Sequence, residues 1–170
     1  MKESLLKTIE SDSFKKGVKF IGLFLLYAAI AGVFFYFTPL EKETTRFAAK
    51  ASQQSLQLVG ISANYIETDY PHLVNEDFDA TINEVCSGGI ELIVLFGIIF
   101  ASFEKPLRER IKGFLVGVII LVIFNLVRIT ATIYFLSDFL HSFFFRVTLV
   151  IVIVLYYWFW FYEPLKQRKG

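Results

Sequence analysis

Apolar residues gather into four long blocks along this chain, separated by polar segments. The blocks cover about residues 18–38, 85–103, 114–136 and 143–162, and none holds more than one charged residue. A helix needs about 20 mostly apolar residues to cross the hydrocarbon core of a bilayer. The pattern therefore predicts an all-α membrane protein, a bundle of about four transmembrane helices in one integral membrane domain over residues 1–170.

The polar segment at residues 39–84 separates the first two blocks. Thr38-Pro39 is expected to end the first helix, because the residue before a proline disfavours helical backbone. Between residues 41 and 66 an imperfect helical stripe of apolar side chains follows, made by Phe47, Ala51, Leu58, Val59, Ile61, Tyr65 and Ile66. This stripe predicts an amphipathic outer helix, which either caps the bundle or acts as a lid that guides substrate. Residues 67–84 are acidic and turn-rich.

Composition supports the membrane assignment, because 55% of the residues are hydrophobic and 18% are aromatic. The net charge of +1 hides a strong sorting of charge along the chain. Lysine and arginine gather before the first block, in the 104–112 loop and in the 163–170 tail, whereas residues 39–84 hold eight acids and three bases. Since cytoplasmic segments carry the excess of lysine and arginine, both termini and the 104–112 loop are expected in the cytoplasm, and residues 39–84 outside.

The distribution of charge, the length of the first apolar block and the number of cysteines each exclude an interpretation. The basic clusters are explained by topology and form no stripe interleaved with aromatics, so no nucleic-acid partner is expected. The first apolar block is too long for the core of a cleaved signal peptide and is interpreted as a retained anchor. The single cysteine excludes a paired-cysteine thiol–disulfide oxidoreductase.

That cysteine, Cys86, opens the second block in the sequence NEVCSGG at residues 83–89. Asn83 is a good N-cap residue, so Cys86 is expected in the first helical turn. The unpaired N–H groups there favour negative charge and lower the pKa of a thiol, which enriches the nucleophilic thiolate. Ser87 and Gly88 leave room for a substrate backbone. Cys86 is therefore a candidate nucleophile; the alternative is a small buried residue that packs at a helix crossing.

Arg128 lies inside the third block, where a charge is costly and usually functional. Its long side chain can reach upward to the level of Cys86. Asn125 precedes it by three residues on the same helical face and is expected to hold it in place. The cation would then stabilise the thiolate or the oxyanion of a tetrahedral intermediate. The alternative is a structural ion pair with Glu84 or Glu91.

Two histidines could supply an acid or base. His141 is the better placed, because it lies in the short outer turn before the fourth block, whereas His72 lies in the long outer segment with nothing evident to fix it. Arg146 is a second cation in the same region and could assist or replace His141. Neither histidine has the companion ligands of a metal site, so no metal or cofactor is expected.

At these residues the chain resembles the exosortase/archaeosortase family of membrane cysteine proteases and transpeptidases. The resemblance rests on a Cys-Ser-Gly element (Cys86 to Gly88), an Asn-x-x-Arg element (Asn125 to Arg128) in the next span, and a histidine (His141) in the outer turn that follows. It covers about residues 80–150. Glu84 is similar to the acidic lead-in of the family, and the small number of spans is similar to the compact exosortase F form.

The resemblance implies a role for each of these residues. Cys86 would be the nucleophile, Arg128 the electrostatic stabiliser and His141 the acid/base. The substrates would be exported proteins that end in a short motif, a transmembrane helix and a basic tail. They would be cleaved at the outer face of a bacterial inner membrane, whose lipid surrounds the enzyme. The oligomeric state stays open, as does the choice between transfer and hydrolysis.

Two functions of other classes stay open as well. One is a non-catalytic membrane assembly or accessory protein in which Arg128 makes a structural ion pair. The other is a small anion transporter subunit with Arg128 and Arg146 along its path.

Overall fold

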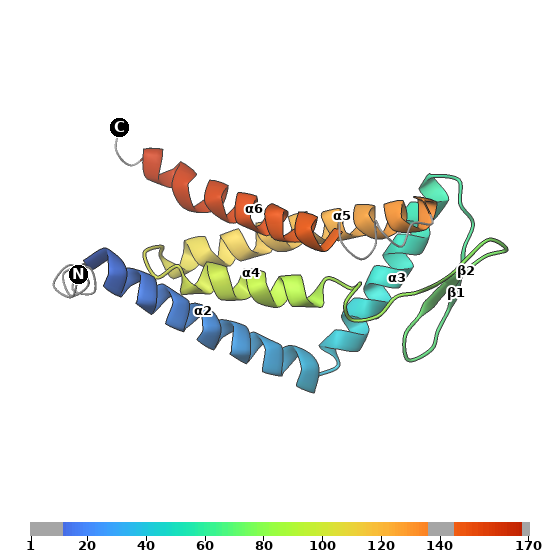
Figure 1. Cartoon of the computed structure of the whole chain (residues 1–170), viewed down its shortest axis with the longest axis horizontal. Helices are drawn as coiled ribbons and strands as arrows, with labels where there is room; N and C mark the ends of the chain where they lie inside the picture. The colour runs from blue at the N-terminus through green and yellow to red at the C-terminus, as the bar shows by residue number, and fades with distance from the viewer. Residues whose placement is uncertain (1–11, 136–144, 168–170) are drawn as a thin grey trace, which may run out of the picture.

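The computed structural model describes residues 12–135 and 145–167, with five helices and three short strands in those ranges. In chain order these are α2 (Asp12–Phe37), α3 (Leu40–Leu58), β1 (Asn64–Ile66), β2 (His72–Val74), β3 (Asp79–Thr81), α4 (Gly89–Ala101), α5 (Leu107–Phe135) and α6 (Phe145–Gln167). Helices α2, α4, α5 and α6 run along the long axis of the molecule (Figure 1). Helix α3 turns across one end of them, and the sheet lies beyond it.

Within those ranges, α2 and α5 are long and apolar enough to cross a membrane. Apolar stretches at Gly89–Ala101 and Val150–Tyr162 are shorter. Helix α4 has 13 residues, a rise of about 20 Å, which is less than the hydrocarbon thickness of about 30 Å. The helical character expected for the four blocks is confirmed, and the count of four spans stays a prediction.

Glycines let the bundle helices approach closely. A Cβ added at Gly97 of α4 would lie 3.0 Å from Phe24 of α2, and one added at Gly117 of α5 would lie 2.7 Å from Tyr156 of α6. Small residues at crossings are typical of membrane helix packing. The buried residues Leu95, Ile99, Leu121 and Ile153 form the core there, which we call the bundle cluster.

The break at Pro39 is confirmed, because α2 ends at Phe37 and α3 begins at Leu40. The outer helix predicted after Pro39 is confirmed as α3, but the predicted apolar stripe is only partly buried. Ile61 and Tyr65 pack against buried residues, whereas Phe47 and Leu58 are 55% and 88% exposed. The buried face of α3, which lies close against α5, is made mainly of small side chains with one large one; its members are Thr45, Ala48, Ala49, Ser52 and Leu56.

A small antiparallel sheet with the order β1-β2-β3 occupies part of the segment expected to be turns. This corrects the all-α expectation. Each strand has three residues, too few for an alternating pattern to be recognised. Leu73 of β2 is fully buried and packs with Leu56 and Ile133 in a second core, which we call the outer cluster.

The two ends of the bundle differ in charge. The start of α2, the end of α6 and the α4–α5 connection lie at one end of the bundle (Figure 1). The turn before α4 and helix α3 lie at the other end. Helix α5 begins at Leu107, so part of the basic 104–112 segment is helical. Lys105 is 6% exposed and lies over the rings of Trp160 and Phe161. The basic loop and the cysteine are therefore at opposite ends, as the charge sorting predicts.

Candidate active site

Cys86 lies in a turn at residues 84–88, the cysteine turn, immediately before α4. The Cys86 N–H donates to both the backbone oxygen and the side-chain Oδ1 of Asn83, each at 3.1 Å. Gly88 ends the turn with a φ of +84°, which favours glycine. The expectation that Cys86 lies in the first helical turn is wrong, because Asn83 caps this turn and α4 starts three residues after the cysteine.

Two buried donors from α5 meet at the backbone carbonyl of Cys86. Asn125 Nδ2 donates to it at 3.0 Å and Arg128 Nη2 at 2.9 Å. Their residues are 5% and 7% exposed. Their spacing of three places both on one helical face, as the sequence predicts. The structure therefore brings Cys86, Asn125 and Arg128 together, and links them through the cysteine backbone.

Glu91 of α4 approaches the same guanidinium from another direction. Its Oε1 lies 4.0 Å from Arg128 Nη1, well beyond the 2.7–2.9 Å of a charged hydrogen bond. The side chains are 16% and 8% exposed, respectively. An ion pair at this distance in a dry site still offsets part of the cost of burying Arg128.

The thiol is covered in this structure. Cys86 is 5% exposed and belongs to the outer cluster, whose buried members are Ala48, Ala49, Leu56, Ala63, Leu73, Ile82, Cys86, Ile129 and Ile133. Most of these come from α3, the sheet and their connections. The thiol is therefore not open to solvent in this structure, and the choice between a fixed cap and a lid for α3 stays a prediction.

The other residues of the cysteine turn have structural roles. Ser87 Oγ donates to the Glu84 carbonyl at 2.8 Å and accepts from the Gly89 N–H at 3.3 Å. A Cβ added at Gly88 would make a tight contact of 3.3 Å with Asn125 Nδ2. The negative charge of the Glu84 carboxylate is the main cause that raises the pKa of the Tyr70 hydroxyl.

His141 lies outside the described residues. Arg146 falls in the first turn of α6, and its side chain also lies outside what the structure describes. His72 is fixed after all, because it lies on β2 and its Nδ1 is 2.7 Å from Asp79 Oδ1. Adjacent strand residues point to opposite faces. Since Leu73 packs in the outer cluster with Cys86, His72 points away from that core.

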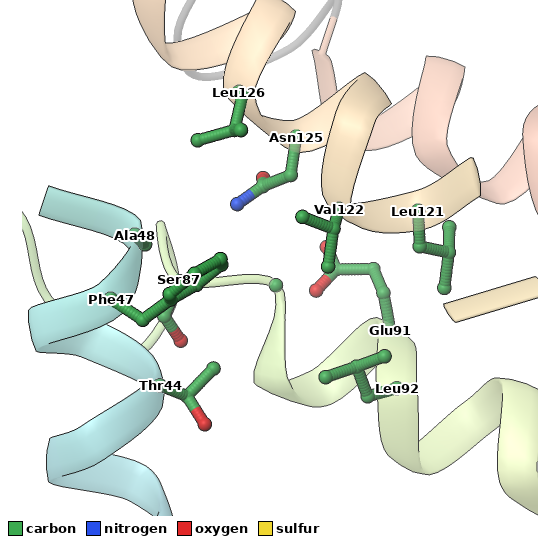
Figure 2. A pocket seen from close by; sticks show the side chains of 11 residues that line it. Thr44, Phe47, Ala48, Ser87, Glu91, Leu92, Leu121, Val122, Asn125 and Leu126 are labelled. Atoms are coloured by element: carbon green, nitrogen blue, oxygen red, sulfur yellow. The ribbon is translucent and has the colours of Figure 1, made fainter. Parts of the chain in front are cut away.

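A small cavity of about 30 Å³ lies beside the cysteine turn, among α3, α4 and α5. Thr44 and Phe47 line it from α3, Glu91 from α4 and Asn125 from α5 (Figure 2). Sequence reasoning missed this cavity, and it treated Glu91 as an ion-pair partner for Arg128 and as an unexpected acid after the glycines, not as a cavity residue. Yet an isolated acid in an apolar block is the same signal that drew attention to Arg128. No cluster of metal-binding side chains occurs in the ranges that the structure describes.

Comparison with known proteins gives an independent result. The model of the transmembrane exosortase family matches residues 14–158. That range includes α2 through most of α6, and with them the cysteine turn, Asn125 and Arg128. No curated protein and no solved structure matches the chain. Since the matched range covers most of the 170 residues, this membrane protein belongs to the transmembrane exosortase family.

Proposed function

We propose that the chain is a membrane-embedded cysteine protease or transpeptidase that cleaves C-terminal sorting signals of exported proteins. The observation that carries the proposal is the buried convergence of Asn125 and Arg128 on Cys86. Membership of the exosortase family supports it. An arginine and an asparagine buried against the backbone of a lone cysteine fit a nucleophile that needs a fixed orientation.

In the proposed reaction the Cys86 thiolate attacks the carbonyl carbon of the scissile peptide bond. The carbonyl oxygen becomes an oxyanion, which the buried Arg128 cation stabilises. His141 protonates the leaving amine, and a thioester remains on Cys86. An acceptor amine or water then attacks the thioester and releases the thiolate.

The fixed position of the Arg128 guanidinium suits this role. Its guanidinium has five N–H donors, and Nη2 already binds the Cys86 carbonyl. The charge is thereby held a few bonds from the sulfur before substrate arrives. Preorganised charge needs no rearrangement when the oxyanion forms.

We place the active site at the outer face of a bacterial inner membrane, with both termini in the cytoplasm. A cysteine at the exposed Leu58, in a Cys86→Ser background, should react with an impermeant maleimide in intact spheroplasts. A cysteine at the exposed Arg108 should react only after lysis. The opposite pattern would invert this topology.

The function is tested by co-expressing the enzyme with an exported protein of the same genome that ends in a motif, an apolar span and a basic tail. Wild type should shorten this protein, and Cys86→Ala should abolish the cleavage. Arg128→Gln should reduce it strongly at equal enzyme levels. Full cleavage by Cys86→Ala would refute the proposal.

A second candidate is a non-catalytic assembly protein, because the covered thiol and the Arg128 bond to a backbone carbonyl also suit a purely structural site. This candidate predicts that a strain carrying Cys86→Ser has the same phenotype as the wild-type strain. The peptidase predicts that the same variant loses it.

A further inference from the structure

The cavity beside the cysteine turn holds two hydrogen-bond acceptors whose needs are not met by any described residue. Asn125 Oδ1 and Glu91 Oε2 are both buried and lack a hydrogen-bond partner within residues 12–135 and 145–167. Asn125 is 5% exposed, and both residues line the cavity (Figure 2). A buried acceptor without a partner is costly, so a donor is expected at these two atoms.

Water is the donor that fits the space. A water molecule needs roughly 10–15 Å³ of cavity measured this way, together with two to four polar partners. The cavity has about 30 Å³ and offers two acceptors, which match the two O–H groups of one water.

The position of the cavity connects this water to the proposed reaction. The walls include Ser87 and Gly88, the two residues that follow the nucleophile. Ala48 of α3 lines the cavity and also packs in the outer cluster with Cys86. Asn125 lies between the cysteine turn and the cavity. Its Nδ2 donates to the Cys86 carbonyl, and its Oδ1 has no partner among the described residues.

We propose that Glu91 is a catalytic base that activates a water held in this cavity, and that this water resolves the Cys86 thioester by hydrolysis. The inference rests on the proposed peptidase function and names its resolving nucleophile. Glu91 touches the reacting water, and Asn125 positions it.

The chemistry balances without a further reactant. Glu91 accepts one proton from the water while the water oxygen forms a bond to the thioester carbonyl carbon. The tetrahedral oxyanion collapses, the C–S bond breaks, and Cys86 leaves as a thiolate. The product is a new carboxylic acid at the C-terminus of the cleaved protein. The proton on Glu91 passes to solvent as the site reopens.

The test uses the full-length enzyme in membranes, the co-expressed substrate described above, and water enriched in oxygen-18. Wild type should place oxygen-18 in the new C-terminal carboxylate. Glu91→Gln keeps the size of the side chain and removes the base. Because a positioned base contributes about 10²–10⁴-fold, hydrolysis should fall by about 10²-fold or more, and a Cys86-linked acyl-enzyme should accumulate.

Added hydroxylamine separates a lost base from a damaged site, because it attacks thioesters without help from a base. It should restore turnover by Glu91→Gln and give a hydroxamate product. Glu104→Gln is the matched control, since Glu104 is exposed at the other end of the molecule and pairs only at the surface with Lys16. It should hydrolyse at the wild-type rate.

Three results would overturn the inference while leaving the cysteine peptidase intact. They are wild-type hydrolysis by Glu91→Gln, a Glu91→Gln enzyme that hydroxylamine does not restore, and a wild-type product without oxygen-18. Cleavage by Cys86→Ala is a different failure, because it refutes the peptidase itself.

Discussion

The burial of Cys86 predicts that its thiol reacts more slowly than a free thiol in the absence of substrate, despite the thiolate-favouring surroundings expected from the sequence. In the lid interpretation α3 leaves the outer cluster before the thiol reacts, so the observed rate is the open fraction multiplied by the intrinsic rate. Leu56 is the largest side chain by which α3 enters that cluster, and it is fully buried. Leu56→Ala should therefore speed the labelling of Cys86.

The size of this effect follows from the packing. Truncating a buried leucine to alanine costs about 2–5 kcal/mol. If about 2 kcal/mol of that cost falls on the closed position of α3, the open fraction rises about 30-fold, since 1.4 kcal/mol corresponds to a factor of ten. The assay is the rate of iodoacetamide labelling in isolated membranes, where Cys86 is the one cysteine of the chain.

Leu58→Ala is the matched control for this experiment. It makes the same substitution two residues later on the same helix, at a side chain that is 88% exposed. Its labelling rate should equal that of wild type. The reasoning fails if Leu56→Ala labels no faster than Leu58→Ala, or if the wild-type thiol already reacts as fast as a free one.

Three further predictions concern the same end of the molecule. Gly88→Ala should lower stability by about 1–2 kcal/mol, because Gly88 has a φ of +84°, and the loss should appear as a lower Tm in detergent. Gly89→Ala should also lower Tm, because its Cβ would lie 2.3 Å from Phe35 Cζ; Phe35→Leu should restore part of the loss, and no restoration would contradict this packing. His141→Ala should slow substrate cleavage by about 10²-fold or more, whereas His72→Ala should leave it near wild type, because His72 faces away from the core that holds Cys86; equal losses in both would contradict these assignments.

The helices were predictable because long apolar blocks have few alternatives in a membrane. The meeting of Arg128 with Cys86 was predictable too, since a buried charge in a span has to find partners near its own depth. The start of α4 was not predictable, because Asn83 can cap a helix or a turn equally well. The left-handed backbone of Gly88 ends the turn, so the helix begins only after it.

The buried face of α3 shows a second limit of sequence reasoning. A hydrophobic stripe marks the buried face when a helix packs through large side chains. Here the contact is made largely by small residues such as Ala49 and Ser52, both fully buried, whereas Leu58 is 88% exposed. The strands of the sheet were missed because three residues give too short a pattern.

The two cores of this molecule share one helix, α5, and that arrangement separates changes near the cysteine turn from changes in the bundle. The outer cluster contains residues of α3, of the sheet and of α5, where Ile129 and Ile133 contribute. The bundle cluster contains Leu121, which also belongs to α5. Residues 39–84 supply much of the outer cluster and, through Thr44, Phe47 and Ala48, one wall of the cavity against α4 and α5. A change in this segment therefore acts on the surroundings of Cys86 without touching the bundle cluster.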